Sequence, residues 1–280
     1  MPQKKFDHKK TYYNDIALKL GHKMFGLDHL HYGYFTNGIK PSLETLNKAQ
    51  NSYSELVLSY IPKSVKKILD VGCGTGGNAE KLVKRKMDVT CIAPDPYLIE
   101  KTKERTQGKI KTYTDLYENI EDFEPESFDL ILMSESCQYI KPDPGWEQNK
   151  KVLKKGGYLL VADFFRIREI DTPYMSKSGQ PLQNFLDRAK AANFKLIKKQ
   201  DITKNVAPTM DIFQGVIDKN IFPLVEAIHE FVLRRFPLLH SLLAKIFKEK
   251  IDKVVTRYKT QDAKTWMKYK AYYIFLFQKQ

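Results

Sequence analysis

The sequence predicts an α/β fold with a mostly parallel sheet, and two features of the chain carry that prediction. Apolar, strand-like runs alternate with helical stretches between residues 60 and 203. Such alternation is typical of parallel strands joined by right-handed crossovers. The first run, residues 68–71, ends in a glycine-dense turn that leads directly into a helix. A chain of 280 residues has room for one such domain and an appendage.

The turn after the first strand is the most informative segment of the chain. Residues 70–77 read DVGCGTGG, so four glycines fall within six positions. Glycine adopts positive φ angles easily and carries no Cβ, which lets a ligand approach the backbone closely. The first turn of the following helix also presents N–H groups that no helical carbonyl can accept. An ordinary strand-to-helix turn needs fewer glycines, so we interpret this segment as a ligand-binding loop.

The remaining elements follow from the same kind of pattern. Strands are predicted, in chain order, at residues 88–93, 110–115, 128–136, 154–164, 194–200 and 272–277. Helices are predicted after the second strand, at 97–105, and before the sixth, at 181–192. Parallel strands end at one edge of a sheet, where a large cofactor can take contacts from several of them.

The glycine spacing resembles motif I of the class I S-adenosylmethionine (SAM) methyltransferases. The succession of strands over about residues 60–203, together with the last strand, also resembles their Rossmann-like sheet. NAD-binding proteins have a differently spaced fingerprint. The resemblance implies that Gly72, Gly74 and Gly76 lie under the methionine part of SAM and that Asp70 contacts its amino group.

The resemblance also assigns the other end of the cofactor. Asp115, at the end of the third strand, matches the acid that accepts a hydrogen bond from adenine N6, which suits a group that can only accept. Asp115 could instead, or in addition, cap a helix at 116–122. Leu116 and Ser134 complete the expected cofactor contacts at these strand ends.

The second strand departs from the family pattern. The family usually ends it with an acid that binds both ribose hydroxyls, whereas this chain has Ala93 at the matching position. Asp95 follows two residues later between Pro94 and Pro96, whose fixed φ angles make a stiff elbow. We expect this elbow to turn the Asp95 carboxylate toward the ribose; the alternative is that water and backbone groups serve the ribose.

About sixty residues separate the sixth strand from the last, too many for a tight hairpin. Their patterns are helical, at residues 212–219, 222–236, 238–256 and 260–270. This arrangement resembles the tocopherol, sterol and cyclopropane-type small-molecule methyltransferases. It implies a mostly parallel sheet with an antiparallel last strand and an α-helical cap inserted before that strand. The domain prediction is an N-terminal helical lid at 1–60, a SAM-binding core at 61–206, a cap at 207–270 and the last core strand at 271–280.

The N-terminal arm contains an aromatic segment, LHYGYF at residues 30–35, preceded by Tyr12 and Tyr13. It resembles the aromatic lid of these enzymes, in which a tyrosine hydroxyl reaches the methionine carboxylate. We therefore expect Tyr13 and Tyr32 to contact the cofactor. The alternative is that the arm simply packs on the sheet.

Candidate catalytic groups gather after the fourth strand, in the segment SESCQYI at residues 134–140. Glu135 is expected to lie near the acceptor, with positioning as its main role. Tyr139 stands where relatives often have a histidine, and with an ordinary pKa of about 10 it should orient the acceptor rather than act as a base. His31, and beside it His29, are further candidate bases on the lid.

Composition bears on location and partners. The formal net charge is +14, and residues 231–270 hold eleven Lys and Arg against three acids. Apolar residues between 238 and 251 recur at helical spacing beside these lysines, which predicts a basic amphipathic helix. Such a helix either packs on the core or contacts an anionic membrane surface. We expect the region 222–256 to select the acceptor.

The sequence predicts a cytoplasmic enzyme. It has no run of about 18 apolar residues, no secretory leader pattern, and three cysteines, Cys73, Cys91 and Cys137, without metal-type spacing. We therefore expect no metal. The resemblance implies methyl transfer from SAM, giving S-adenosylhomocysteine, to a small, lipophilic or amphipathic acceptor. Two alternatives stay open, an RNA methyltransferase that uses the basic surface and an N- or O-methyltransferase of small polar metabolites. The sequence leaves the oligomeric state open.

Overall fold

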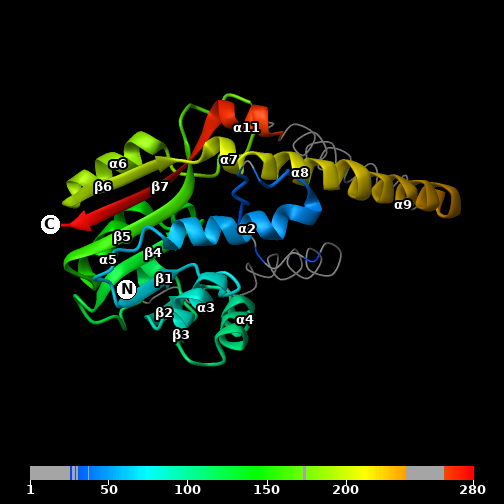
Figure 1. Ribbon diagram of the computed structural model, residues 1–280. Helices are drawn as coiled ribbons and strands as arrows, with labels where there is room; N and C mark the ends of the chain where they lie inside the picture. The colour runs from blue at the N-terminus through cyan, green and yellow to red at the C-terminus, as the bar shows by residue number, and fades with distance from the viewer. Residues whose placement is uncertain (1–25, 27–28, 30, 37, 173–174, 238–261) are drawn as a thin grey trace.

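The computed structural model describes residues 26, 29, 31–36, 38–172, 175–237 and 262–280. These parts of the chain form one seven-stranded sheet in the order β3-β2-β1-β4-β5-β7-β6 (Figure 1). Its strands are β1 (Lys67–Val71), β2 (Asp88–Ile92), β3 (Lys111–Tyr113), β4 (Phe128–Ser134), β5 (Leu153–Arg166), β6 (Phe194–Asp201) and β7 (Lys270–Lys279). The pairs among β1 to β5 are parallel, and β7 runs antiparallel between β5 and β6. The predicted mostly parallel sheet with an antiparallel last strand is confirmed.

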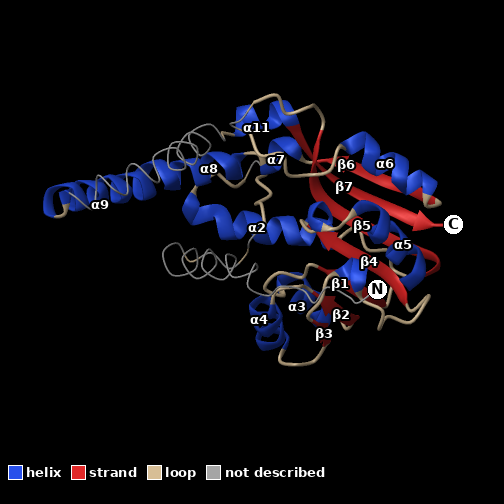
Figure 2. Ribbon diagram, turned by 180° about the vertical axis from the view of Figure 1, so that it is seen from behind, coloured by secondary structure: helices blue, strands red, loops and turns tan. Residues whose placement is uncertain are grey.

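Helices cover both faces of this sheet (Figure 2). They are α2 (Leu43–Leu58), α3 (Gly77–Lys84), α4 (Pro96–Thr106), α5 (Pro142–Val152), α6 (Leu182–Ala191), α7 (Thr203–Val206), α8 (Pro208–Val216), α9 (Phe222–Arg235) and α11 (Ala263–Tyr269), with short 3₁₀ turns η2 (Tyr117–Asn119) and η3 (Cys137–Tyr139). One face packs against α2, α3 and α11, and the opposite face against α5 and α6.

Alternation along the central strands divides the core into these two layers. Ile68, Leu130 and Leu132 point to the α2 side, while their neighbours Leu69 and Ile131 point to the α5 side. All five are completely buried. Successive side chains of a strand point to opposite faces, so a sheet covered on both sides has continuous apolar strands. This explains why the central strands were recognisable in the sequence.

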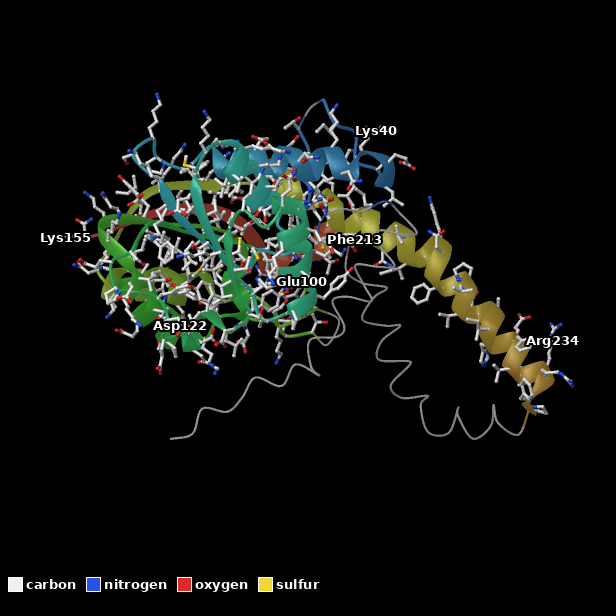
Figure 3. All side chains as sticks on the ribbon, turned by 90° about the horizontal axis from the view of Figure 1, so that it is seen from below. Lys40, Glu100, Asp122, Lys155, Phe213 and Arg234 are labelled. Atoms are coloured by element: carbon white, nitrogen blue, oxygen red, sulfur yellow. The ribbon has the colours of Figure 1, made fainter. Side chains whose placement is uncertain are left out.

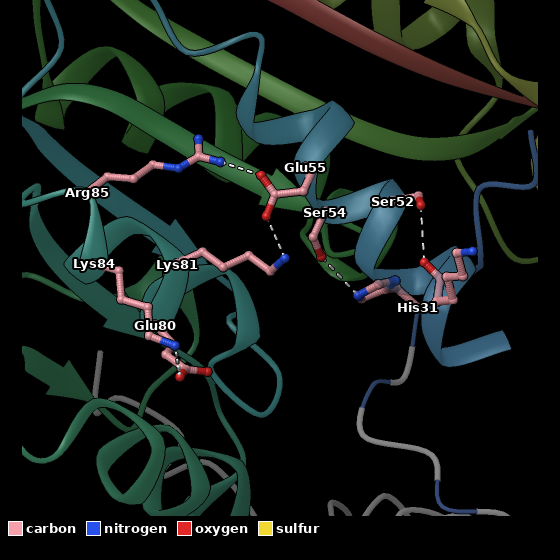
Figure 4. Close-up of polar contacts among 9 residues, drawn as sticks. His31, Ser52, Ser54, Glu55, Glu80, Lys81, Lys84 and Arg85 are labelled. Carbon is pink, nitrogen blue, oxygen red and sulfur yellow. Dashed lines mark hydrogen bonds and ion pairs between the residues drawn. The ribbon is translucent and has the colours of Figure 1, made fainter. Parts of the chain in front are cut away.

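Helix α2 joins the N-terminal arm to the sheet. Ser42 caps it through a reciprocal capping box with Thr45. Glu55, on its outer side, makes ion pairs with Lys81 of α3 and with Arg85, the residue that follows α3, at 2.6 and 2.5 Å (Figure 4). Residues 32–36 of the arm before α2 form neither helix nor strand, and they hydrogen-bond to α2 and α7. Residues 1–25 of the predicted lid lie outside the described residues.

The first part of the predicted cap is one continuous helical rod. The predicted helix at 222–236 is present as α9, and the one predicted at 212–219 begins earlier, at Pro208, and ends at Val216 as α8. A π-helical turn that was not predicted, η4 (Ile217–Ile221), joins the two. Pro223 has no N–H group, so it cannot donate the helical hydrogen bond to the carbonyl four residues earlier. The wider π-helical turn just before it lets the helix continue. The predicted helix at 238–256 lies outside the described residues.

Helix α9 projects away from the sheet, with Phe213 of α8 near the body and Arg234 near the far end (Figure 3). None of its described residues is buried. Its large apolar side chains that are about half exposed, from 45 to 62%, are Leu224, Val225, Ile228, Phe231 and Leu233. No helix in the described parts of the chain has the length and apolar character needed to cross a membrane.

Candidate active site

A cavity of about 380 Å³ opens at the carboxyl ends of β1 to β4. The chain passes from β1 outward to β2 and β3 and then returns to β4 on the other side of β1. Open α/β sheets bind ligands at such a reversal of strand order, in pockets of about 300–1,000 Å³. The cavity brings together eleven residues predicted from the sequence: His29, His31, Asp70, Gly72, Gly74, Asp95, Asp115, Leu116, Ser134, Glu135 and Tyr139.

The glycine turn forms one wall of this cavity. Gly74 has a φ of +57°, and a Cβ built on it would meet no protein atom within 4 Å, because the residue faces the cavity. Gly72 also lines the cavity, and a Cβ there would come within 2.4 Å of the Ser136 Cβ. Gly76 does not line it; it precedes α3 and packs against Thr102 of α4. Two of the three expected glycines therefore border the ligand space.

Three buried oxygens beside the cavity have no hydrogen-bond partner among the described residues. They are Asp70 Oδ2, Asn78 Oδ1 and Asp95 Oδ2, and all three residues line the cavity. A buried acceptor without a donor costs about 1–3 kcal/mol, so such a cluster calls for a ligand rich in donors. SAM offers an ammonium group, two ribose hydroxyls and an adenine amine, and it fits this requirement. Burial raises the pKa of Asp70 to about 7.

The sequence predicts that the helix turn containing Asn78 presents its N–H groups to a ligand, but it does not predict a role for the Asn78 side chain. Asn78 occupies the second position of α3, directly after the glycine turn. An amide at this point could have been noticed, because the first turn of a helix that opens from a glycine loop is where a ligand approaches.

Asp95 has two roles that the sequence could not separate. Its Oδ1 accepts from Tyr97 N at 2.9 Å and caps α4. Its Oδ2 is the unpartnered oxygen, and the residue is only 5% exposed. The elbow formed by Pro94 and Pro96 thus directs the carboxylate to the cavity wall, beside Ala93.

Asp115 and Leu116 also line the cavity, just after β3. Asp115 Oδ1 accepts from Leu116 N at 2.7 Å. The turn η2 begins after Leu116 and has no side-chain cap, so the alternative of Asp115 as a helix cap has no support here. Ser134, at the end of β4, lines the cavity and contacts the Tyr53 hydroxyl at 3.0 Å.

Glu135 follows β4 with a φ of +57°, a strained conformation for a residue other than glycine. Its Oε1 accepts from Tyr32 N at 2.8 Å and from the Tyr272 hydroxyl at 2.9 Å. Burial raises the pKa of Glu135 to about 8, and the nearby charge of Asp163 adds to the rise, while the two donors oppose it. A carboxyl with a pKa near neutrality is suited to proton transfer.

The His31 ring is fixed by contacts with the arm and with α2. Its Nδ1 donates to the Tyr32 carbonyl at 2.9 Å, and its Nε2 lies 3.4 Å from the Ser54 hydroxyl (Figure 4). The ring lies 4.8 Å from that of His29 and 4.7 Å from that of Tyr53. Burial lowers the pKa of His31 to about 3 and that of His29 to about 4. Both rings are neutral at pH 7 and are weak bases, so Glu135 is the better candidate.

The predicted tyrosines are placed differently from one another. Tyr139 lies on the cavity rim and is 78% exposed. Tyr32 does not line the cavity; its ring packs among Phe164, Trp266 and Tyr272, with centroids 5.7–6.1 Å away. Tyr13 lies outside the described residues.

A further buried acid supports the loop after β4. Asp163 of β5 is completely buried and accepts from Gln138 N and Nε2, each at 3.2 Å. Burial raises its pKa to about 6. Asp163 was not predicted, although an acid inside the apolar run LLVADFF at 159–165 was visible. Within the described residues, no group of three His, Cys, Asp or Glu side chains is placed to hold a metal ion.

Comparison with known protein families gives this architecture its class. Residues 69–161 match the family model described as a methyltransferase domain. The matched stretch runs from β1 into β5 and contains the glycine turn, Asp95, Asp115 and Glu135. Residues 69–161 are therefore a methyltransferase domain, and it lies on the Rossmann-like sheet expected of a class I SAM-dependent methyltransferase.

Individual relatives carry the same description. Methyltransferase GfsG of Streptomyces halstedii is 26% identical over 216 residues, which cover 70% of this chain and 76% of the relative. Uncharacterized methyltransferase YodH of Bacillus subtilis is 31% identical over 113 residues, which cover 39% of this chain and 48% of the relative. The chain thus spans about three quarters of the first relative and about half of the second.

Two solved structures share the fold over nearly the whole chain. The 4+2 cyclase SpnF has a TM-score of 0.69 at 19% identity, covering 97% of this chain and 95% of that chain. A geranyl diphosphate C-methyltransferase from Streptomyces coelicolor A3(2), solved with Mg²⁺, geranyl diphosphate and S-adenosylhomocysteine, has a TM-score of 0.69 at 12% identity, covering 100% of both chains. At such identities these likenesses concern the fold alone.

Proposed function

We propose that this chain transfers a methyl group from SAM to a small-molecule acceptor, with Glu135 as the base that removes the acceptor's proton. The observation that carries the proposal is the cavity at the ends of β1 to β4, which combines unpartnered buried acceptors with a carboxyl whose pKa lies near neutrality. The methyltransferase match and relatives such as GfsG support it.

The cofactor contacts follow from chemistry at each position. Asp70 and Asn78 would accept hydrogen bonds from the ammonium group of SAM. The backbone at Gly74, where no Cβ blocks approach, would lie against the methionine part. Asp95 Oδ2 would accept from a ribose hydroxyl, and Asp115 from the adenine amine. When bound, SAM supplies an activated methyl group, so the protein has only to align the acceptor, remove a proton and exclude water.

The charge of the cavity restricts the acceptor. Five acidic side chains line the cavity, namely Asp70, Asp95, Asp115, Glu118 and Glu135. Its described lining residues include no Lys or Arg. Asp70, Asp95 and Asp115 are assigned to SAM in this proposal, so the charge that an acceptor meets is that of Glu118 and of ionised Glu135. These negative groups repel an anionic acceptor in a site of low dielectric. We therefore infer a reacting group that is uncharged or cationic and bears a removable proton. Apolar wall residues such as Leu98 and Ile140 suit a lipophilic body.

A lipophilic acceptor would be found at a membrane, and α9 is suited to meet one. Its half-exposed apolar residues lie on the same helix as Arg234 and Arg235, at the far end of the rod. Glu226 and Glu230 balance the two arginines, and Glu230 is paired with Arg234 at 3.2 Å. Helix α9 would therefore bind a surface through its apolar area, while the chain's net charge of +14 supplies the attraction to anionic lipid. We propose that α9 brings the enzyme to anionic membranes. This membrane contact is a separate part of the proposal, and the proposed methyl transfer does not depend on it.

The fold by itself does not establish methyl transfer, since it is shared by a protein described as a 4+2 cyclase. The experiment that decides is incubation of the purified chain with methyl-labelled SAM and extracts of lipids, polar metabolites or RNA. Label in a lipid-phase small molecule is the expected result. Label in polar metabolites or RNA would favour the other acceptor classes, and no label in any fraction would contradict the proposal.

A further inference from the structure

Two buried tyrosine hydroxyls lie behind Glu135 and form a chain of hydrogen bonds. Tyr272 of β7 donates to Glu135 Oε1, and its hydroxyl lies 2.7 Å from that of Tyr53 of α2. The Tyr53 hydroxyl in turn lies 3.0 Å from Ser134 Oγ. Both tyrosines are completely buried. The proposed reaction uses neither of them directly, so their buried hydroxyls need an explanation.

The number of protons fixes the direction of this chain when Glu135 is ionised. A hydroxyl donates one hydrogen bond, so when Tyr272 donates to Glu135, the 2.7 Å contact makes Tyr272 the acceptor from Tyr53. The Ala162 carbonyl also lies within reach of both hydroxyls, at the longer distances of 3.3 and 3.4 Å. Tyr53 must then accept from Ser134. The order is Ser134 to Tyr53 to Tyr272 to Glu135, and both ends of the chain lie at the cavity wall.

We propose that Tyr272 is a positioning residue for Glu135: its hydroxyl, backed by that of Tyr53, fixes Oε1 and leaves Oε2 to face the acceptor. The inference rests on the proposed role of Glu135 as the base. In the described part of the chain, both hydrogen bonds to this carboxyl reach Oε1, from Tyr32 N and from Tyr272. A carboxylate held at one oxygen by two donors keeps a defined orientation.

The rest of the molecule holds these two donors in place. Tyr272 packs edge-on against Tyr53, with ring centroids 5.9 Å apart, and its backbone N–H donates to Thr203 Oγ1 at 2.9 Å. The Tyr32 ring packs 5.7 Å from that of Trp266, in helix α11 just before β7. The last strand, helix α2 and the N-terminal arm therefore meet at one carboxyl.

The electrostatic surroundings of Glu135 give the proposal a measurable consequence. Burial and the Asp163 charge favour the neutral carboxyl, whereas the donors Tyr32 N and Tyr272 favour the ionised one. The titratable groups that face it come from the arm, α2, η3, β5 and β7: Tyr32, Tyr53, Tyr139, Asp163 and Tyr272. Loss of the Tyr272 hydroxyl removes a donor to the charged form, so the pKa of Glu135 must rise.

The direct test is a ¹³C NMR titration of protein labelled at the glutamate carboxyl carbon, with Glu135→Gln used to assign the signal. In Tyr272→Phe, the apparent pKa of Glu135 should rise by about one unit. The matched control is Tyr60→Phe, which removes a buried tyrosine's hydrogen bond to Gln200 on the same face of the sheet. The control should titrate as the wild type does. An unchanged pKa in Tyr272→Phe would overturn the proposal.

Further readouts separate positioning from a purely structural role. Tyr53→Phe should raise the pKa of Glu135 as well, but by less than Tyr272→Phe does. If Tyr272→Phe does not fold, the titration of Tyr53→Phe tests the proposal in its place. With an acceptor from the extract screen, Tyr272→Phe should move the pH dependence of methyl transfer to higher pH at unchanged SAM affinity. An equal loss of rate at every pH would contradict positioning. Absence of methyl transfer in the wild type would refute the proposed function, while the NMR titration would still decide whether Tyr272 controls Glu135.

Discussion

The Tyr272 hydroxyl donates to Glu135 Oε1 at 2.9 Å, although the two residues lie 137 positions apart in the chain. Glu135 directly follows the central strand β4, and Tyr272 belongs to the antiparallel strand β7, which pairs with β5 rather than with β4. The late strand therefore does more than complete the sheet. It supplies a donor to the carboxyl that we propose as the base.

Gly74→Val should abolish binding of SAM and S-adenosylhomocysteine, which we expect to bind the wild type at micromolar levels. The side chain would enter the cavity, since no protein atom lies within 4 Å of the position. The positive φ adds about 1–2 kcal/mol of strain, and Gly108→Val controls for it, because Gly108 has a φ of +66°, equal open space and no place in the cavity. Calorimetry would measure both variants. Equal binding by Gly74→Val would show that the methionine pocket is misplaced.

Asp95→Ala should weaken SAM binding by about 1.5–3 kcal/mol, the size of a lost hydrogen bond to a charged group. The same change removes the cap of α4, which costs about 1 kcal/mol of folding stability. Asp95→Ser separates the two effects, since serine caps a helix well but its shorter side chain cannot reproduce the carboxylate. We expect near-normal melting and weak SAM binding in Asp95→Ser. Normal affinity in both variants would assign the ribose to water or backbone groups.

Glu135→Gln should become more stable relative to the wild type as the pH rises from 5 to 8. The folded pKa of Glu135, about 8, lies above the unfolded value of about 4.5, so the folded state holds the proton more tightly. The stability that this proton contributes is complete below pH 4.5 and is lost as the pH rises to 8. The limiting slope is about 1.4 kcal/mol per pH unit. Denaturant unfolding at several pH values would measure it, with exposed Glu124→Gln as the control. A pH-independent difference would refute the raised pKa.

Phe231→Glu should weaken binding to vesicles of anionic lipid by about tenfold, because it replaces a 62% exposed apolar side chain on α9 with an acid. Ile197→Glu makes the same change in charge at a 46% exposed site on β6, away from α9, and should bind as the wild type does. Co-sedimentation at low and high salt would measure both, and high salt should weaken the wild type as well. Equal loss in the two variants would point to net charge rather than to α9. If the wild type does not bind the vesicles, the proposed contact of α9 with anionic membranes is wrong.

Much of the fold could be predicted because its signals are local. Apolar runs such as 128–136 and the glycines of 72–77 are legible one segment at a time, and the structure places strands and turn there. The contacts of Glu135 could not be predicted, because they join residues from the arm, α2 and β7 that only tertiary packing brings together. Asn78 and Asp163 were missed for a related reason. Their importance lies in burial, which a single sequence does not display.

The measurement that tests the central claim most directly compares the methyl-transfer rates of wild type and Glu135→Gln, with labelled SAM and the acceptor from the extract screen. Glutamine keeps the size of the side chain, so SAM affinity should stay the same. It cannot take a proton from the acceptor, so the rate of methyl transfer should fall. The account predicts a rate about 10²–10⁴-fold lower in the variant, the usual contribution of a general base. Equal rates at equal SAM affinity would contradict it.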